Sequence, residues 1–284
     1  MSRAARGIRE LIRPEPVLEG AGVRLRRSIG TRTLDNVDPF LLFDDFSSPN
    51  PADHTAGFPM HPHRGIETVT YLLDGTVKHR DTTGAHGVLG PGDVQWMTAG
   101  SGILHEEMPQ QRARGIAGFQ LWVNLPAKLK MTPPRYQEFA AADIPEVGVE
   151  AGVKVRIIAG SIGKVEGPVK GIAAAPIYLD VRLHAGTKFE HALPSSYAAF
   201  IYVYDGEALV GDRSVGHPKM AVLGSGDVVS VGASAEGARF LLVAGKPLGE
   251  PVARHGPFVM NTRAEIEQAL KDLQQGTFIK KENV

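Results

Sequence analysis

The stretch HPHRGIETVTYLLDG, residues 61–75, places two histidines on either side of a proline and continues into an apolar run that ends at Asp-Gly. Short runs rich in Val, Ile, Tyr and Phe, bounded by Gly, Pro or Asp, predict β-strands. Similar runs recur along the chain, among them GFQLWVNL at 118–125, VKVRIIAG at 153–160, AAFIYVY at 198–204 and ARFLLVAG at 238–245. Many short strands with regular turn signals favour all-β sandwiches or barrels.

The end of the opening stretch recurs in the second half of the chain. Tyr71–Gly75 reads YLLDG and Tyr202–Gly206 reads YVYDG, while VLGPGD at 88–93 returns as VLGSGD at 222–227. The two pairs keep the same order at nearly the same separation, which favours a duplicated β-domain over a chance likeness of common turn residues.

Helical periodicity is confined to the C-terminal segment NTRAEIEQALKDLQQG. Thr262 and Glu265 have the spacing of a capping box, and Gly276 is a stop signal. The apolar stripe between them consists of Ile266, Ala269, Leu270 and Leu273. We therefore expect two β-domains, residues 1–135 and 136–284, the second ending in a helix near 262–275.

Composition argues against several classes of protein. Lys+Arg and Asp+Glu both number 31, so no excess charge points to direct nucleic-acid binding or to a membrane surface. Cysteine is absent, which excludes disulfides, thiolate metal sites and cysteine nucleophiles. The sequence contains no run of about 18 apolar residues, so we expect no membrane-spanning helix. The N-terminus lacks the apolar core of a secretory signal. These features predict a cytoplasmic protein.

Two polar doublets predict a metal site. Residues i and i+2 of a strand point to the same face, so His61 and His63 project together, as do His105 and Glu107. Three imidazoles and one carboxylate suit a divalent first-row metal such as Fe, Ni, Co, Cu, Mn or Zn. Glu67, four residues after His63, is either a fifth ligand or a group that hydrogen-bonds a ligand.

The other histidines are weaker candidates, because an isolated histidine is more often a satisfied polar residue than a ligand. We expect surface or structural roles for His54, His79, His86, His184, His191, His217 and His255. The second repeat carries no equivalent ligand set, since the matching positions are Ala192, Pro194, Arg239 and Leu241. The sequence thus predicts one metal per chain, in the first domain.

Four segments carry a further signal: HPHRGIETVTYLLDG, LGPGDVQWMTAGSGILHEEMP, LWVNLP and RHGPFVMNT. They resemble the pirins, members of the cupin superfamily. The resemblance implies a bicupin, in which two antiparallel jelly-roll β-barrels are joined and the N-terminal cupin holds a single iron, most simply Fe²⁺. By motif position it assigns the ligands to His61, His63, His105 and Glu107, and leaves Glu67 in doubt.

The resemblance also implies a reaction. Bacterial pirins are similar to quercetin 2,3-dioxygenases, which predicts a metal-dependent dioxygenase that uses O₂ to open the heterocycle of a flavonol and releases CO. Glu107 would then remove the proton of the flavonol 3-hydroxyl. Phe58, Met60, Gln120 and Trp122 are candidate cavity residues, from their positions near the ligands or on a following strand.

A regulatory function is the alternative reading. Pirins of animals are described as nuclear, iron-dependent transcription cofactors. The resemblance therefore also allows a redox-sensing protein that binds a transcription factor or a metabolic enzyme without turnover.

Overall fold

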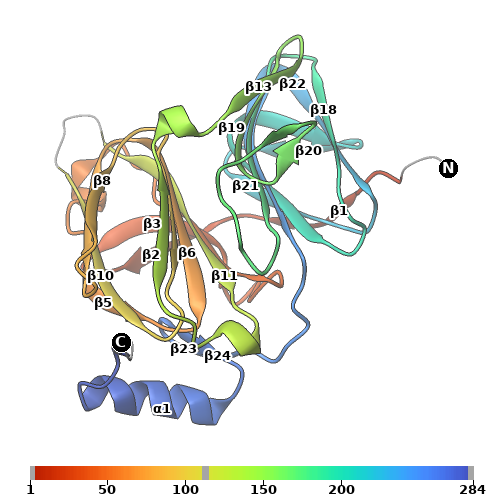
Figure 1. Cartoon of the computed structure of the whole chain (residues 1–284). Coiled ribbons are helices and arrows are strands. Elements are labelled where there is room, and N and C mark those ends of the chain that lie inside the picture. The colour runs from red at the N-terminus through yellow and green to blue at the C-terminus, as the bar shows by residue number, and fades with distance from the viewer. Residues whose placement is uncertain (1–3, 111–114, 281–284) are drawn as a thin grey trace. The chain divides into compact units, whose positions relative to one another are not determined.

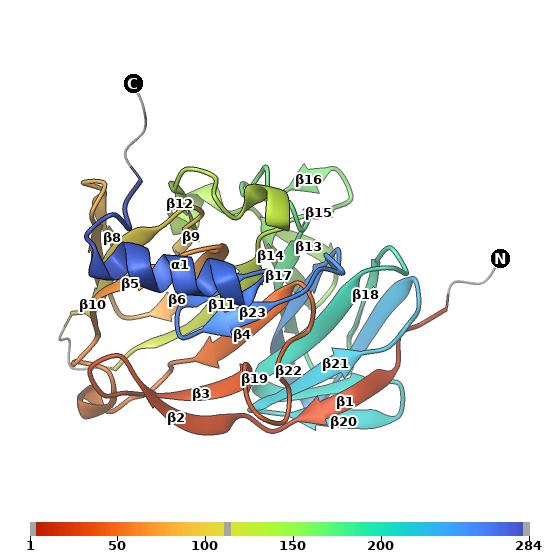
Figure 2. The same ribbon diagram turned by 90° about the horizontal axis from the view of Figure 1, so that it is seen from below.

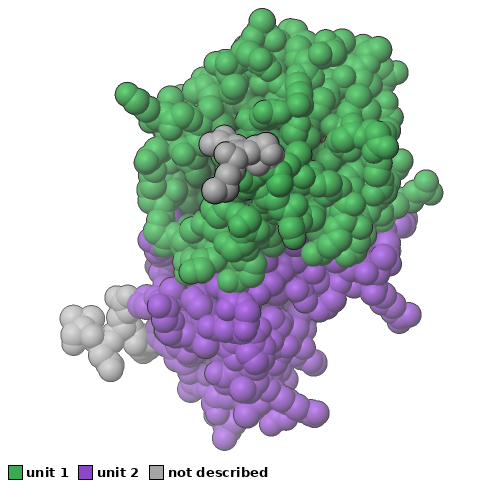
Figure 3. Space-filling view, turned by 90° about the vertical axis from the view of Figure 1, so that its right-hand side faces the viewer, with its two compact units in different colours: residues 1–14, 142–247 green, residues 15–141, 248–284 purple. Residues whose placement is uncertain are grey.

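The computed structural model describes residues 4–110 and 115–280 and is built largely of strands, with a single α-helix in this part of the chain (Figure 1). It divides into two compact units (Figure 3). Unit 1 comprises Met1–Pro14 and Ala142–Pro247, and unit 2 comprises Glu15–Ala141 and Leu248–Val284.

This division differs from the single boundary at residues 135 and 136 that the sequence predicts. The N-terminal strand β1 (Ile8–Ile12) pairs with β21 (Lys219–Leu223), which places the start of the chain in the unit of the second repeat. The C-terminal helix belongs instead to the unit of the first repeat. Pairing and packing between such distant segments leave no trace in local sequence patterns, so the repeat alone suggests a simpler division.

The two largest sheets of unit 2 are antiparallel. One has seven strands in the order β12-β9-β6-β11-β4-β3-β2, and the other has four in the order β5-β10-β7-β8. The seven are β2 (Glu15–Glu19), β3 (Val23–Ile29), β4 (Phe40–Asp45), β6 (Ile66–Asp74), β9 (Val94–Thr98), β11 (Ala117–Asn124) and β12 (Arg135–Phe139). The four are β5 (Phe58–His63), β7 (Val77–Asp81), β8 (His86–Leu89) and β10 (Ile103–Pro109).

The central strands β6 and β11 of the larger sheet are buried on both faces. Their sequences are rich in apolar residues and threonine, so burial of both faces exposes few charged groups to the interior. Successive side chains alternate between the faces. Thr70 of β6 contacts Glu107 of β10, so this face of the larger sheet looks toward the smaller one. Gln120, paired with Thr70 in the register, shares this face, whereas Val69 and Tyr71 point to the other. The polar positions therefore gather between the two sheets.

Unit 1 contains one nine-stranded antiparallel sheet that curves around an apolar interior. Large side chains such as Phe189, Ile201 and Phe240 fill this interior. The strands besides β1 and β21 are β13 (Glu146–Glu150), β14 (Val153–Ala159), β17 (Ile177–Leu183), β18 (Lys188–Ala192), β19 (Ala198–Val210), β20 (Arg213–Gly216) and β22 (Val228–Gly245). A small hairpin, β15 (Ser161–Ile162) and β16 (Val165–Glu166), lies outside the sheet.

The chain ends in unit 2 with the hairpin β23 (Ala253–His255) and β24 (Phe258–Met260), followed by α1 (Arg263–Gln274). The helix lies against this hairpin (Figures 1 and 2). The predicted capping box of Thr262 and Glu265 is present. The predicted stripe is wrong at one position: Leu273 is 37% exposed, and Asp272 is buried in its place. No helix among the described residues is long and apolar enough to cross a membrane.

Three short 3₁₀ turns complete the described structure. They are Pro51–Asp53, Ala127–Leu129 and Ala141–Asp143, all of which lie in unit 2 or at its boundary.

Candidate metal centre

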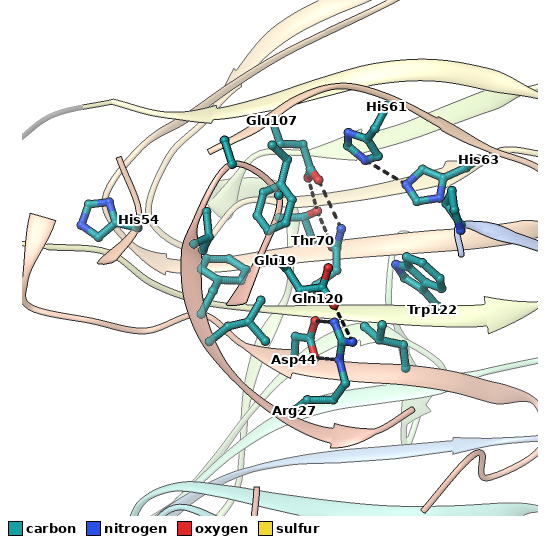
Figure 4. Close-up of a pocket in the computed structure, with 18 of the residues that line it drawn as sticks. Glu19, Arg27, Asp44, His54, His61, His63, Thr70, Glu107, Gln120 and Trp122 are labelled. Atoms are coloured by element: carbon teal, nitrogen blue, oxygen red, sulfur yellow. Dashed lines mark hydrogen bonds and ion pairs between the residues drawn. The ribbon is translucent and has the colours of Figure 1, made fainter. Parts of the chain in front are cut away.

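Three histidines converge on the inner face of the smaller sheet of unit 2. Strands β5 and β10 are antiparallel neighbours, and His105 lies opposite His61. The Nε2 atoms of His61 and His63 are 3.0 Å apart, as expected for two side chains on one face of a strand (Figure 4). One ring nitrogen from each of His61, His63 and His105 lies within 4.8 Å of the others. Within residues 4–110 and 115–280, this is the single such cluster of potential ligands.

The environment favours neutral imidazoles. Burial, followed by the charge of His61, holds the pKa of His63 well below its ordinary value. Burial, followed by the neighbouring rings, does the same to the pKa of His105. Because a neutral imidazole keeps a lone pair on one ring nitrogen, His63 and His105 are ready to bind a metal at neutral pH.

The hydrogen-bonding state of the site also fits a metal ion. Both ring nitrogens of His105 are buried without a hydrogen-bond partner among the described residues. An unsatisfied buried polar group costs about 1–3 kcal/mol, so two on one ring need a compensating partner. A divalent cation that accepts imidazole nitrogen would satisfy one of them, and Fe, Ni, Cu and Zn are all suitable.

Glu107, predicted as the fourth ligand, is buried on the same side of β10 but lies outside the three-histidine group. Its Oε1 lies 2.9 Å from Thr70 Oγ1, and its Oε2 lies 3.3 Å from Gln120 Nε2 (Figure 4). Strand β10 is regular here, since His105 pairs with Asp81 and Glu107 with His79 of β7, so Glu107 lies two residues further along the same face. The carboxylate consequently faces the larger sheet.

Glu67 points away from the histidines. It is three residues before Thr70 on the unbroken strand β6, so its side chain lies on the opposite face of the sheet. Its Oε1 accepts a hydrogen bond from Thr98 Oγ1 at 2.8 Å. Glu67 is therefore placed neither as a fifth ligand nor as a hydrogen-bonding partner of the three histidines.

The site opens into a cavity of about 910 Å³ in unit 2, a volume typical of small-molecule sites. Of the predicted cavity residues, Phe58, Gln120 and Trp122 line it. The prediction for Met60 is wrong, because this side chain does not line the cavity and is 41% exposed. Met60 alternates with His61 along β5, so it points to the outer face.

Sequence reasoning missed a charged group in the same cavity. Arg27 donates from Nε and Nη2 to the two carboxylate oxygens of Asp44, at 2.8 and 2.7 Å, and from Nη1 to Glu19 at 2.8 Å. Figure 4 shows this group apart from His61 and His63, beyond Gln120. Arg27 and Asp44 are register partners on β3 and β4, a relationship that requires knowledge of the strand pairing.

Two histidines expected to be surface or structural are buried in unit 2. His54 and His79 are both buried, and His79 Nε2 lies 2.6 Å from Glu138 Oε1. In unit 1, His191 stacks on Phe189, and burial lowers its pKa. Burial excludes a surface position for His54 and His79, and His54 lines the cavity; a structural role for the three residues stays a prediction.

Comparisons with known proteins agree with the fold. The pirin family model matches residues 22–123, and the model of the pirin C-terminal cupin domain matches residues 178–279. A pirin-like protein of Caulobacter vibrioides is 47% identical, over 96% of this chain and 99% of its own. Human pirin is 45% identical, over 90% of this chain and 88% of its own.

A solved structure extends the likeness to three dimensions. A quercetin 2,3-dioxygenase from Acinetobacter baumannii superimposes with a TM-score of 0.87 at 35% identity, over 97% of this chain and 99% of its own. The predicted all-β bicupin with a short C-terminal helix is thereby confirmed. The chain belongs to the pirin family of the cupin superfamily.

Proposed function

We propose that this pirin is a metal-dependent dioxygenase that opens the heterocycle of flavonols such as quercetin and releases CO. The observation that carries the proposal is the convergence of three imidazoles, two of them held neutral by burial, beside a large cavity that also contains the buried carboxylate of Glu107. The likeness to the Acinetobacter baumannii quercetin 2,3-dioxygenase supports the substrate class.

The cofactor in this proposal is one Fe²⁺ per chain, held by His61, His63 and His105, with Glu107 as the fourth ligand. When bound, the ion supplies Lewis acidity and the redox chemistry that a reaction of a flavonol with O₂ requires. Imidazole nitrogens accept several first-row metals. An Escherichia coli pirin of the same fold was solved with nickel(II), so the metal content of the active protein must be measured.

Glu107 is the proposed base. A carboxylate can take the proton of the flavonol 3-hydroxyl if it is held within hydrogen-bond reach. Thr70 and Gln120 contact its two oxygens and thereby fix the plane of the carboxylate. Both atoms of O₂ enter the opened product, and ring carbon 3 leaves as CO with its own oxygen.

The cavity wall would select a flat, largely apolar molecule that carries hydroxyl groups. Its lining includes the apolar side chains of Val23, Leu25, Leu42, Phe58 and Val77. The carboxylates of Asp44 and Glu19 lie in the same cavity and can accept hydrogen bonds from phenolic hydroxyls.

Aerobic incubation of the iron-loaded protein with quercetin tests the proposal. We expect loss of the flavonol absorbance together with CO formation, and neither signal from the matched His61→Ala, His63→Ala double variant. A fully loaded parent protein that leaves quercetin intact would contradict the dioxygenase proposal. Binding of a protein partner that depends on the oxidation state of the iron would then favour the regulatory alternative.

A further inference from the structure

A buried arginine joins the two strands that carry the histidine cluster. Arg64 directly follows His63 at the end of β5, and its side chain is 2% exposed. Its Nε donates to the carbonyl oxygen of Ser101 at 2.7 Å. Ser101 lies just before β10, the strand of His105. One guanidinium group thus connects the end of one ligand strand to the beginning of the other.

The C-terminal segment holds the same guanidinium from the other side. Nη1 of Arg64 donates to Asp272 Oδ2 of α1 at 2.7 Å, and Nη2 donates to the carbonyl oxygen of Phe278 at 2.9 Å. The Phe278 ring lies over the guanidinium, 4.3 Å from its centroid. Since Arg64 has a rigid, planar fork of donors, three fixed acceptors determine its position.

The C-terminal segment also contacts the backbone next to both ligand strands, just after β5 and just before β10. The amide of Val259 in β24 donates to the carbonyl of Arg64 at 3.1 Å. A Cβ atom at Gly65 would lie 2.0 Å from the carbonyl oxygen of Val259, and one at Gly102 would lie 2.9 Å from the Phe278 ring. Glycine at these two positions permits the close approach at each strand.

A second buried cation reinforces the turn after His63. Lys130 Nζ donates to the carbonyl oxygens of Gly65 and Val259, both at 2.9 Å, and to Asn124 Oδ1 at 2.6 Å. The three N–H donors of an ammonium group match these three acceptors. The turn between β5 and β6 is therefore tied to β24 by an independent contact.

We infer that Arg64 is a positioning residue of the metal centre, and that residues 258–279 set the affinity for the metal without supplying a ligand. The inference rests on the proposed metal site. Its physical basis is the Arg64 link between the end of β5 and the start of β10, because these strands are paired from His63 and Ile103 onward and the link fixes the end of the pair that carries His63. A role limited to fastening the helix would account for Asp272, but it gives no reason for the Arg64–Ser101 bond.

The test uses Asp272→Asn in the full-length protein, with Glu267→Gln as the matched control. Glu267 lies on the same helix and pairs with Arg263 at 3.0 Å, but both side chains are exposed. The Co²⁺ dissociation constant is measured by chelator competition, the visible spectrum of bound Co²⁺ reports ligand geometry, and thermal unfolding of the metal-free protein reports the fold. We expect Asp272→Asn to weaken binding about 10-fold or more and to change the spectrum, and Glu267→Gln to do neither.

An Asp272→Asn protein with the dissociation constant and spectrum of the parent would overturn the inference, even if it unfolds at a lower temperature. Should this variant fail to fold, Phe278→Leu replaces it, since it keeps the carbonyl acceptor and removes the ring over Arg64. Weaker Co²⁺ binding by Phe278→Leu supports the inference, and unchanged binding refutes it. A parent protein that binds no Co²⁺ would refute the proposed metal site itself. Equal binding by parent and variant would leave that site in place and refute only the role of Arg64 and residues 258–279.

Discussion

The Nε2 atoms of His61 and His63 approach to 3.0 Å on one face of β5. At that distance two neutral rings can share one proton, which would satisfy this pair alone. His105 brings two more buried ring nitrogens to the same place, and neither has a hydrogen-bond partner among the described residues. A cation that accepts a lone pair from each ring gives a partner to one nitrogen of all three imidazoles. Protons shared among three neutral rings leave more of these buried nitrogens without a partner.

The first prediction follows from this cluster. Purified protein should bind one metal ion per chain, and His61→Ala combined with His63→Ala should abolish tight binding, because one histidine and a displaced carboxylate are too few ligands. His191→Ala is the control, since His191 stacks on Phe189 in unit 1, away from any such cluster in the described chain. Elemental analysis after dialysis measures the stoichiometry. Two tightly held ions, or one that survives the double substitution, would mean that the site lies elsewhere.

The second prediction concerns Glu107. Glu107→Gln should keep most of the bound metal, because the three histidines remain, but turnover of quercetin should fall by about 10²–10⁴-fold, the usual cost of losing a general base. A glutamine fills the same space and still contacts Thr70 and Gln120, so the cavity should keep its shape. Initial rates and metal content are measured on the same samples. Parental turnover in the variant would exclude Glu107 as the base.

The sequence predicts the composition of the site better than its geometry. Strand periodicity is enough to place His61 with His63, and the repeat motifs are enough to predict two β-domains. Glu107 shares the face of His105, as the alternation predicts, but two residues of strand displace it by about 7 Å, and its carboxylate contacts Thr70 and Gln120 of the larger sheet. Spacing along one strand predicts the face of a side chain but not the partners it meets on the opposite sheet, because those partners are distant in sequence.

The C-terminal segment shows a second limit of sequence reasoning. Helical periodicity predicts α1 and its cap correctly, and it also assigns Leu273 to the buried stripe. In the structure the buried residue is Asp272, because Arg64 supplies a charged partner in the packing interface. A hydrophobic pattern cannot anticipate this, since the partner is distant in sequence and the carboxylate is stable there only when paired.

The third prediction is a pH effect at this pair. Burial alone would raise the pKa of Asp272, but hydrogen bonds from Lys280, Arg64 and Gln268 outweigh it and lower the pKa below its ordinary value. A carboxyl with a depressed folded-state pKa contributes stability above its unfolded pKa, about 3.9, and loses that contribution as the pH falls further. We compare pH 5 and pH 3, which lie roughly one unit above and below the unfolded pKa. Between them, the free energy of unfolding should fall more in the parent than in Asp272→Asn.

Urea denaturation at the two pH values measures this difference. Glu267→Gln again serves as control, because its exposed pair with Arg263 should contribute little. Parallel acid profiles for the parent and Asp272→Asn would show that the Arg64 contact does not stabilise the ionised carboxylate.

The last prediction tests the backbone contact beside His63. Gly65 and Gly84 both have positive φ, +78° and +93°, so alanine at either position incurs a conformational cost of about 1 kcal/mol or slightly more. The positions differ in their surroundings: a Cβ at Gly84 meets nothing within 4 Å, whereas one at Gly65 would lie 2.0 Å from the Val259 carbonyl oxygen. Overpacking adds about 1–3 kcal/mol, so Gly65→Ala should lower the free energy of unfolding by about 2–4 kcal/mol and Gly84→Ala by about 1 kcal/mol. Equal losses in urea denaturation would mean that β24 does not press on this turn in solution.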